Sequence, residues 1–387
     1  MATSAIGPGF ITQTATFTST LGAAFAFGIL ASILIDFVVQ VNIWRIVTLT
    51  RMRASDIANA ALPGAGYLLT ALVVIGGLFF NIGNIGGTGL GLNVLIGLDP
   101  KWGGLCSALL AIGLFLSRRA GATFDQLIIV AGLTMLVLTG YVAVVSAPPV
   151  GEALRQSIFP DEIDFAVITT IVGGTVGGYI TYAGAHRLLD KGMTGPENLN
   201  AVSRAALTGI ALTGVMRFVL FLAVLGVLSA GTQINLAGDS ANPAAQAFEA
   251  AAGEIGLRLF GAILWVAAIT SVIGAAYTSV SFLTVFKIDL TERRRDIAIV
   301  CFIAISLFFY LIINTPPAKM LVFVGGLNGL ILPIGLSIFL YAAVARSDLL
   351  QGYRYPRWLL GLGILVSALT WYMGYRSIGP IFALLGP

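Results

Sequence analysis

The residues best suited to chemistry are glycines gathered inside one long apolar segment. Residues 171–182 read I-V-G-G-T-V-G-G-Y-I-T-Y, within an apolar segment that runs from about 165 to 189. A segment of this length can cross a bilayer, although each glycine in a helix interior costs about 1 kcal/mol. The cluster predicts either an unwound helix that opens a binding site or a small-residue face for close helix packing. The candidate binding residues of this stretch are Gly174, Thr175, Gly177, Gly178 and Tyr179.

A second group of candidate residues lies in the first apolar segment, which reads G-P-G-F-I-T-Q-T-A-T-F-T-S-T-L-G at residues 7–22. Thr18, Ser19 and Thr20 are residue types that commonly cap helix N-termini. They predict a helix break here, with a second half-helix that starts near Leu21. Hydroxyls, unpaired N–H groups and the partial positive charge of a helix N-terminus together favour a carboxylate. The glycine break would leave volume for the organic body of such a ligand.

Three ionisable residues inside apolar segments are candidates for charge balance or ion coupling. Asp36 is a buried carboxylate in I-L-I-D-F-V-V, suited to a proton or a sodium ion. His186 is the side chain expected to titrate near neutral pH, with a gate or headgroup contact as the alternative. An intramembrane arginine is a functional-site hypothesis by default, so Arg217 either balances an anionic substrate, pairs with Asp36, or snorkels to the membrane surface.

The composition requires these residues to be positioned by membrane-spanning helices. Hydrophobic residues make up 58% of the chain and charged residues only 10%, whereas soluble domains carry about 25% charged residues. The chain is therefore expected to be an integral membrane protein whose partners are a small molecule and the lipid bilayer, not nucleic acid. Its two cysteines fall in apolar segments and suggest neither a disulfide nor a metal site. No cofactor is predicted.

About eleven apolar segments are long enough to be transmembrane spans. Thirteen lysines and arginines fall in the loops on one side and four on the other, which predicts a cytoplasmic N-terminus. The approximate limits of the segments are 7–26, 28–48, 65–85, 103–117, 124–146, 165–189, 203–229, 257–284, 296–314, 318–344 and 358–379.

The first and the sixth segments are both interrupted, with four continuous segments between them. Interrupted helices at matching positions of two halves are typical of transporters built from inverted repeats. We expect one transmembrane domain over 1–387, with repeats at about 5–147 and 163–346 and an extra helix at about 357–380. A channel is the alternative, but the chain contains no filter-like repeat. An enzyme fits less well, because the H-E-x-x-H and G-x-S-x-G motifs are absent.

Four motifs resemble those of one transporter family. They are G-P-G-F-I at 7–11, N-I-G-N-I-G-G-T-G-L-G-L at 81–92, G-T-V-G-G-Y-I-T-Y at 174–182 and L-I-L-P-I at 330–334. With them the chain resembles the NRAMP family of divalent-metal transporters, which have the LeuT-type fold. The resemblance implies an all-α integral membrane protein with a 5+5 inverted repeat, helices 1 and 6 interrupted, and alternating access. It also implies a multi-pass protein of a bacterial-type inner membrane.

The chain departs from that family where the family binds metal. The family's Asp-Pro-Gly-Asn break falls on Thr18 to Leu21, and its Met-Pro-His break falls on Gly177 to Tyr179. Acidic residues of the family's proton route are Asn81 and Asn84 here, which also makes both asparagines candidates for substrate binding. The glutamine that the family has in span 10 is Ile331.

These departures change the expected substrate. Transition metals require anionic oxygen, imidazole or sulfur ligands, and no such set is placed at either break. We therefore expect no metal site and a secondary transporter of a small organic carboxylate or amino-acid-like substrate. Divergent NRAMP-like proteins are associated with 5-oxoproline use, which makes that compound the first substrate to test. The alternative is a transporter of a divalent cation such as Mn²⁺ or Mg²⁺. Either substrate would be coupled to H⁺ or Na⁺.

Overall fold

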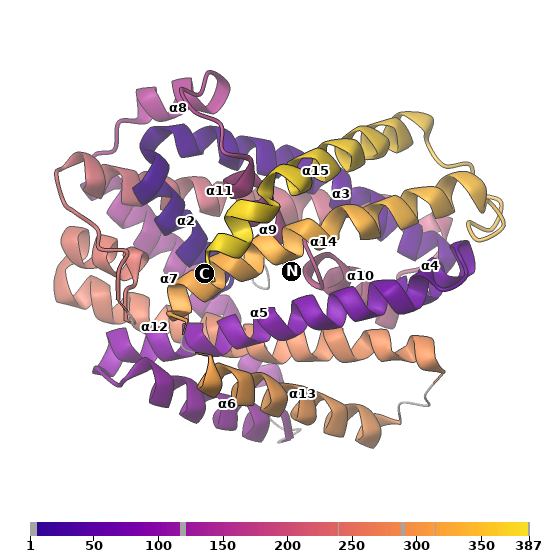
Figure 1. The fold of residues 1–387 in the computed structure, drawn as a ribbon, viewed down its shortest axis with the longest axis horizontal. Helices are drawn as coiled ribbons and strands as arrows, with labels where there is room; N and C mark the ends of the chain where they lie inside the picture. The colour runs from indigo at the N-terminus through magenta and orange to yellow at the C-terminus, as the bar shows by residue number, and fades with distance from the viewer. Residues whose placement is uncertain (1–5, 117–120, 239, 288–290, 314, 386–387) are drawn as a thin grey trace.

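The computed structural model describes residues 6–116, 121–238, 240–287, 291–313 and 315–385, with side chains omitted at 121–129 (Figure 1). The described chain forms helices throughout. In order they are α2 (Pro8–Leu21), η1 (Gly22–Ala24), α3 (Phe25–Thr50), α4 (Ala54–Ala61), α5 (Ala65–Ile96), α6 (Pro100–Leu116), α7 (Gly121–Val145), α8 (Val150–Ile158), α9 (Phe165–Thr175), α10 (Ile180–Asp190), η2 (Pro196–Asn198), α11 (Leu199–Ser229), α12 (Pro243–Ser281), η3 (Phe282–Phe286), α13 (Glu292–Ile312), α14 (Pro317–Ala345) and α15 (Arg357–Ala383).

The helices are long and apolar enough for a multi-pass membrane protein. Within the described residues, eight helical stretches meet the length and hydropathy needed to cross a bilayer, and a ninth is added if residues 130–145 and 150–158 count as one bent span. The first stretch, Pro8–Thr50, contains two of the predicted segments, and α6 is shorter than the rest at 17 residues. Each of the eleven predicted segments coincides with a helix or a broken helix pair.

The helix ends define two faces of the molecule. At one face α3 ends, α4 lies across the surface and α5 begins, and we call this the Arg53 face. At the opposite face α2 ends and packs, through η1, against the short helix α8. We call this the α8 face.

The first helix break lies later in the chain than predicted, and at the α8 face. Helix α2 continues through Thr18, Ser19 and Thr20 and ends at Leu21, and Gly22 then turns the chain with a φ of 54°. The three hydroxyls cap no N-terminus. They donate instead to backbone carbonyls one turn earlier in α2, that of Thr18 to Thr14 at 2.6 Å. The prediction that these residues begin a half-helix was wrong, because hydroxyls inside a helix can bond back to the preceding turn.

The second break lies where the glycines predicted it. Helix α9 ends at Thr175, and α10 begins at Ile180, whose N–H donates to the Gly177 carbonyl at 3.1 Å. Gly178 has a φ of 53°, in the left-handed region that favours glycine. The last carbonyls of α9 and the first N–H groups of α10 therefore meet inside the protein.

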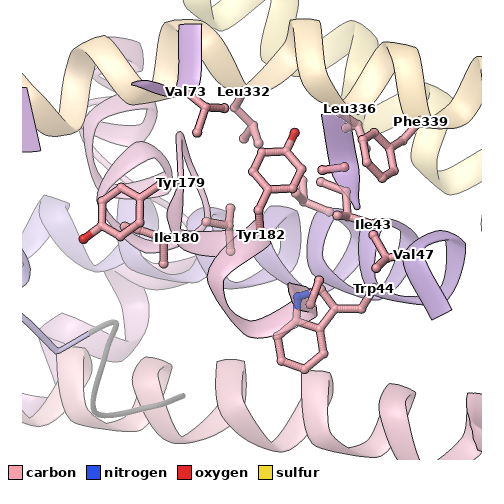
Figure 2. Packing of buried hydrophobic residues seen from close by; sticks show 14 of the residues in the cluster. Ile43, Trp44, Val47, Val73, Tyr179, Ile180, Tyr182, Leu332, Leu336 and Phe339 are labelled. Atoms are coloured by element: carbon pink, nitrogen blue, oxygen red, sulfur yellow. The ribbon is translucent and has the colours of Figure 1, made fainter. Parts of the chain in front are cut away.

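The second half of this broken helix, α10, is held by a core of apolar and aromatic side chains. Figure 2 shows Tyr182 beside Leu332 of α14, with Val73 of α5 on one side and Phe339 of α14 on the other. Below it, the indole of Trp44 on α3 donates to the Thr181 carbonyl at 2.8 Å. The ring of Tyr179, at the start of α10, belongs to the same core but points away from Tyr182 and Trp44. The core thus fixes α10 on one side and leaves Tyr179 on the side of the break.

Candidate functional site

Close packing accounts for one glycine of the cluster, Gly173. A Cβ atom at this position would overlap the carbonyl oxygen of Gly325 and the amide nitrogen of Gly329. Helix α9 therefore lies directly on the backbone of α14, which passes through the middle of the fold (Figure 1). The small-residue packing face predicted as an alternative is present here. The next glycines have different neighbours.

Gly174 faces the side chain of Gln13, which reaches the break from α2. Gln13 is completely buried, and its Nε2 donates to the Leu321 carbonyl at 2.9 Å. Its Oε1 has no hydrogen-bond partner. A Cβ at Gly174 would overlap that oxygen, and a Cβ at Gly325 would overlap Nε2. The two glycines therefore make room for one carboxamide.

Gly178 faces a second buried carboxamide, that of Asn328 on α14. Nδ2 of Asn328 donates to the Val324 carbonyl at 2.9 Å and to the Gly76 carbonyl at 3.3 Å. Its Oδ1 has no partner and occupies the place where a Cβ of Gly178 or of Gly76 would lie. The volume expected to be open at the break is thus filled by two side-chain amides. This corrects the sequence prediction, which considered only the residues of the broken helix.

Tyr179 and Asn84 extend this cluster toward α5. The ring of Tyr179 packs edge-on against Phe80, with ring centres 5.3 Å apart. The Asn84 amide lies beside the Tyr179 hydroxyl, and both its Nδ2 and its Oδ1 lack a hydrogen-bond partner of good geometry. Asn81 points elsewhere, since its Nδ2 donates to Ser306 of α13 at 3.2 Å. The structure therefore brings one of the two predicted asparagines to the break.

A buried cation lies beside the last turn of α9. The guanidinium of Arg217, on α11, is 4.3 Å from the centre of the Phe10 ring and donates through Nη1 to the Ile171 carbonyl at 3.4 Å. Its Nε and Nη2 have no partner. Asp36 and Thr175 complete this second cluster: the carboxyl of Asp36 interacts electrostatically with Arg217 and is next to the Thr175 hydroxyl, and its Oδ1 is unpartnered. Arg217 is 2% exposed, so it does not snorkel.

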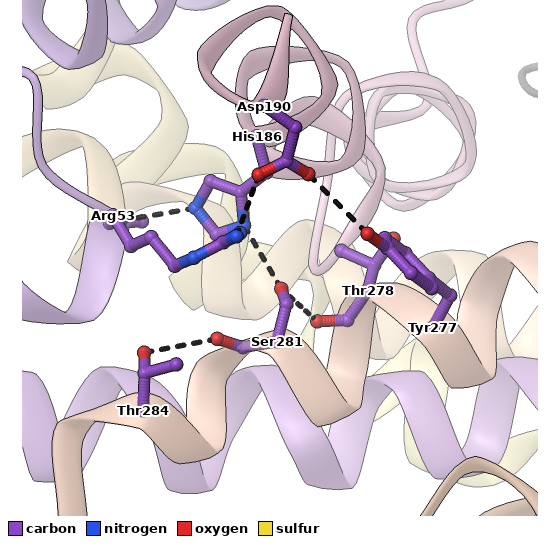
Figure 3. Close-up of polar contacts among 8 residues, drawn as sticks. Arg53, His186, Asp190, Tyr277, Thr278, Ser281 and Thr284 are labelled. Carbon is purple, nitrogen blue, oxygen red and sulfur yellow. Dashed lines mark hydrogen bonds and ion pairs between the residues drawn. The ribbon is translucent and has the colours of Figure 1, made fainter. Parts of the chain in front are cut away.

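His186 belongs to a different cluster, at the Arg53 face (Figure 3). Its Nε2 accepts from the N–H of Ala54, the first residue of α4, at 3.1 Å. Its Nδ1 lies 3.0 Å from the hydroxyl of Ser281 on α12, and that hydroxyl donates to Thr278. An ion pair at 2.7 Å between Arg53 and Asp190 covers this cluster. His186 therefore joins α10 to α4 and α12, away from the glycine break.

Taken together, these contacts define the central cluster as the set of buried polar residues around the second break. It includes the predicted residues of the break itself, together with Asn84, Asp36 and Arg217. It also includes Gln13 and Asn328, which sequence reasoning did not single out. Each is a carboxamide within an apolar segment. Such a polar side chain, together with glycines elsewhere in the apolar segments that could make room for it, is the sequence pattern that indicates these two residues. Thr18, Ser19 and Thr20 lie farther along α2, toward the α8 face.

The chemistry of the central cluster is that of neutral amides with one buried carboxylate and one buried guanidinium. Within the described ranges, no three His, Cys, Asp or Glu side chains converge as a metal site would require. The unpartnered atoms are amide oxygens, the amide nitrogen of Asn84, two guanidinium nitrogens of Arg217 and one carboxylate oxygen. The arrangement can thus accept hydrogen bonds at several points, donate one from an amide and donate charge-assisted hydrogen bonds from the guanidinium.

Two protein sequences are similar to this chain over nearly its whole length. The uncharacterized membrane protein YcsG of Bacillus subtilis (strain 168) is 52% identical over 378 residues, which cover 98% of this chain and 92% of that protein. An uncharacterized membrane protein of Haemophilus influenzae is 53% identical over 378 residues, 98% of this chain and 94% of that one. Both relatives come from bacteria.

Solved structures share the fold at low identity. The manganese transporter of Eremococcus coleocola, in complex with an aromatic bis-isothiourea compound, has a TM-score of 0.75 and 15% identity, covering 99% of this chain and 85% of that one. MhsT in complex with L-phenylalanine has a TM-score of 0.67 and 17% identity, covering 99% and 96%. These likenesses confirm the LeuT-type fold predicted from the sequence.

The family assignment follows from a match that spans the chain. Residues 1–378 match the family described as natural resistance-associated macrophage protein-like (Nramp). The resemblance seen in the four sequence motifs is thereby confirmed. The chain belongs to the Nramp-like family, as a multi-pass membrane protein with the LeuT-type fold that acts as a secondary transporter and not as an enzyme.

Proposed function

We propose that this transporter carries a small organic carboxylate and that Arg217 receives the carboxylate group. The observation that carries the proposal is the buried guanidinium beside the second break, with Nε and Nη2 unpartnered. A buried charge with unused donors is costly unless a partner of opposite charge satisfies it. A carboxylate can accept from two guanidinium nitrogens at once, which is the strongest common pairing for such a group.

The surroundings of Arg217 support a ligand that enters from the break. The guanidinium of Arg217 contacts the ring of Phe10 on α2 and the carbonyl of Ile171 on α9, about one turn before Gly174. Gln13 lies on α2 with Phe10, and its neighbour Gly174 lies on α9 with Ile171. The guanidinium and the Gln13 carboxamide therefore border the same part of α9. The ligand that we propose is of amino-acid size, and 5-oxoproline is the first candidate. Asp36, next to Arg217, is the candidate for coupling to H⁺ or Na⁺.

The second candidate function is the transport of a divalent cation, as in the manganese transporter that shares the fold. The favourable observation is one buried carboxylate, Asp36, near the broken helix. A dehydrated dication requires several oxygen ligands, preferably anionic. Arg217 places a positive charge beside the same carboxylate and opposes such an ion. MhsT in complex with L-phenylalanine has the same fold, so the fold alone does not decide between the two substrates.

The membrane and the orientation complete the proposal. The two similar sequences are named as membrane proteins of bacteria, which supports a place in a bacterial inner membrane. The excess of basic residues in the loops of the Arg53 face supports a cytoplasmic position for that face and for the N-terminus. The two repeats, at about 5–147 and 163–346, would then rock around the central cluster to give alternating access.

Uptake by proteoliposomes tests the proposal. Radiolabelled 5-oxoproline and ⁵⁴Mn²⁺ would be compared for the wild type, Arg217→Gln, Arg217→Lys and the control Arg204→Gln. Arg204 is exposed on the same helix, so its substitution removes an equal charge outside the site. Hydrogen bonds to charged groups are worth about 1.5–3 kcal/mol, so Arg217→Gln should lower the apparent carboxylate affinity about ten- to a hundredfold.

Two results would contradict the proposal. One is saturable Mn²⁺ uptake by the wild type with no carboxylate uptake. The other is an Arg217→Gln variant that stays monodisperse in detergent and transports 5-oxoproline as well as Arg204→Gln does. Arg217→Lys guards against misfolding as an explanation, because it keeps the positive charge and loses the paired donor geometry.

A further inference from the structure

Two carboxamide oxygens at the second break are both buried and unpartnered. They are Gln13 Oε1, in the cradle of Gly174 and Gly325, and Asn328 Oδ1, in the cradle of Gly178 and Gly76. We propose that these oxygens accept hydrogen bonds from N–H groups of the substrate, so that the site selects carboxylates that also carry an N–H donor. This inference rests on the proposed function, because it assumes that the carboxylate group pairs with Arg217.

The orientation of both amides is set by their nitrogen atoms. Nε2 of Gln13 donates to the Leu321 carbonyl, and Nδ2 of Asn328 donates to the carbonyls of Val324 and Gly76. Turning either amide by 180° would place its oxygen against those carbonyl oxygens. The atoms aimed at the glycines of the break are therefore acceptors and cannot serve as donors.

Burial makes an unused acceptor costly, and both acceptors are fully buried. Gln13 and Asn328 are each 0% exposed. Buried polar atoms in folded proteins almost always have a partner, and the exceptions call for an explanation such as a ligand. Asn81 is the matched case away from the break, because its Nδ2 donates to Ser306 of α13 and its Oδ1 also lacks a partner. Gln13 and Asn328 differ from Asn81 in that their open oxygens face glycines of the broken helix, Gly174 and Gly178.

The spacing relative to Arg217 fits one small ligand. Phe10, which holds the guanidinium, lies three residues before Gln13 on α2, and Ile171 lies three residues before Gly174 on α9. Residues three apart on a helix are about 5–6 Å apart at Cβ. The residues that contact the guanidinium, Phe10 and Ile171, thus lie about one helical turn from Gln13 and Gly174. A carboxylate with an N–H one or two bonds away, as in an α-amino acid or a lactam acid, spans such an offset.

Glycine packing alone is the competing explanation for these contacts. In that case the amides would fill space between helices, and ligands with and without N–H groups would bind equally. In the proposed case, a ligand that places a second acceptor opposite Gln13 Oε1 is rejected. Sites built to hydrogen-bond a substrate group discriminate strongly against analogues that lack it, because the buried partner is then left unpaired.

The test compares two ring-shaped carboxylates that differ in one atom. 5-Oxoproline has a ring N–H, and 5-oxotetrahydrofuran-2-carboxylate has a ring oxygen at the same place. Affinities would be measured by competition on the purified full chain for the wild type, Gln13→Met, Asn328→Leu and the control Asn81→Leu. The readout is the ratio of the two affinities, which does not depend on the fraction of protein that is folded.

We expect the wild type and Asn81→Leu to favour the N–H compound at least about tenfold, consistent with one lost hydrogen bond. Gln13→Met or Asn328→Leu should bring the ratio close to one. Equal binding of both compounds by the wild type would overturn the inference while leaving the carboxylate proposal intact. So would a ratio that survives in both variants. If neither compound binds, the carboxylate proposal itself fails, and the inference falls with it.

Discussion

Two buried polar clusters lie along the same broken helix, and they differ in how completely their hydrogen bonds are satisfied. At the Arg53 face, both ring nitrogens of His186 have partners, and the hydroxyl of Ser281 both accepts and donates (Figure 3). At the second break, the oxygens of Gln13 and Asn328 and two nitrogens of Arg217 have none. The side chains compared are all buried, so exposure to water does not explain the difference. At the rim of the first cluster, Arg53 and Asp190 are partly exposed, and Nη1 of Arg53 has no partner.

The difference separates a structural role from a binding role. Satisfied hydrogen bonds rigidify the elements that they join, and those of His186 join α10 to α4 and α12. An incomplete network is stable only if something else satisfies it or if the surrounding packing holds it open. We therefore interpret the first cluster as a clasp that holds one half of the broken helix, and the second as the proposed ligand site.

The largest expected effect is on folding and tests whether Gly173 differs from its neighbours. Gly173→Ala places a methyl group against the Gly325 carbonyl oxygen, and backbone atoms cannot move aside without separating α9 from α14. We expect a loss of several kcal/mol of stability, beyond the usual 1–3 kcal/mol for overpacking. Yield and thermal unfolding in detergent measure it. Gly361→Ala is the control, because no atom lies within 4 Å of a Cβ there, and equal stability of the two variants would refute the close contact.

The next effect should fall on transport more than on folding. Gly178→Leu introduces a side chain where Asn328 Oδ1 lies and forces a non-glycine residue to a φ of 53°. The end of a side chain can rotate away, so we expect a folded protein of reduced stability that no longer transports. Uptake at near wild-type rate by a monodisperse variant would show that the Asn328 cradle is not part of the substrate site.

The sequence was sufficient for the fold and for the position of the second break. The lengths of the apolar segments and the four motifs predict the fold. The clustered glycines, which destabilise a continuous helix, predict the break, and all of these are local features of the sequence. The contents of the site were not predictable in the same way. Gln13 and Asn328 matter because they face glycines more than 100 residues away in the chain, and no local pattern encodes that pairing. The hydroxyls of α2 misled because a capping residue and a helix-interior hydroxyl look alike in sequence.

A smaller effect should distinguish the clasp from the central cluster. His186→Leu removes both ring hydrogen bonds and leaves the Ala54 N–H and the Ser281 hydroxyl with one partner fewer. We expect a loss of about 2 kcal/mol of stability and an altered transport rate, since α10 is released at the Arg53 face.

Ligand affinity is the quantity that decides this third prediction. Equilibrium binding of 5-oxoproline to His186→Leu should stay within about threefold of the wild type, because His186 does not touch the central cluster. Arg53→Gln serves as the comparison, as a partly exposed ion pair contributes only about 0–1 kcal/mol. A tenfold loss of affinity in His186→Leu would join the two clusters into one site.

The smallest expected effect is at Thr18, where the sequence alone predicted one of the largest. If this hydroxyl bound the substrate carboxylate, Thr18→Val would lower the affinity roughly ten- to a hundredfold. In the structure that hydroxyl donates to the Thr14 carbonyl at 2.6 Å, and this carbonyl is already within the reach of the helical N–H of Thr18. Valine has the same shape, so we expect binding and uptake within about threefold of the wild type. Thr18→Asp should destabilise the protein without creating cation uptake, because a carboxylate there would be buried within α2, and the described residues contain no converging group of three His, Cys, Asp or Glu side chains. Comparing Thr18→Val with Gln13→Met shows which part of α2 contacts the substrate. If Thr18→Val loses affinity while Gln13→Met does not, the site lies at the α8 face beside η1, and the unpartnered amides at the second break are packing alone.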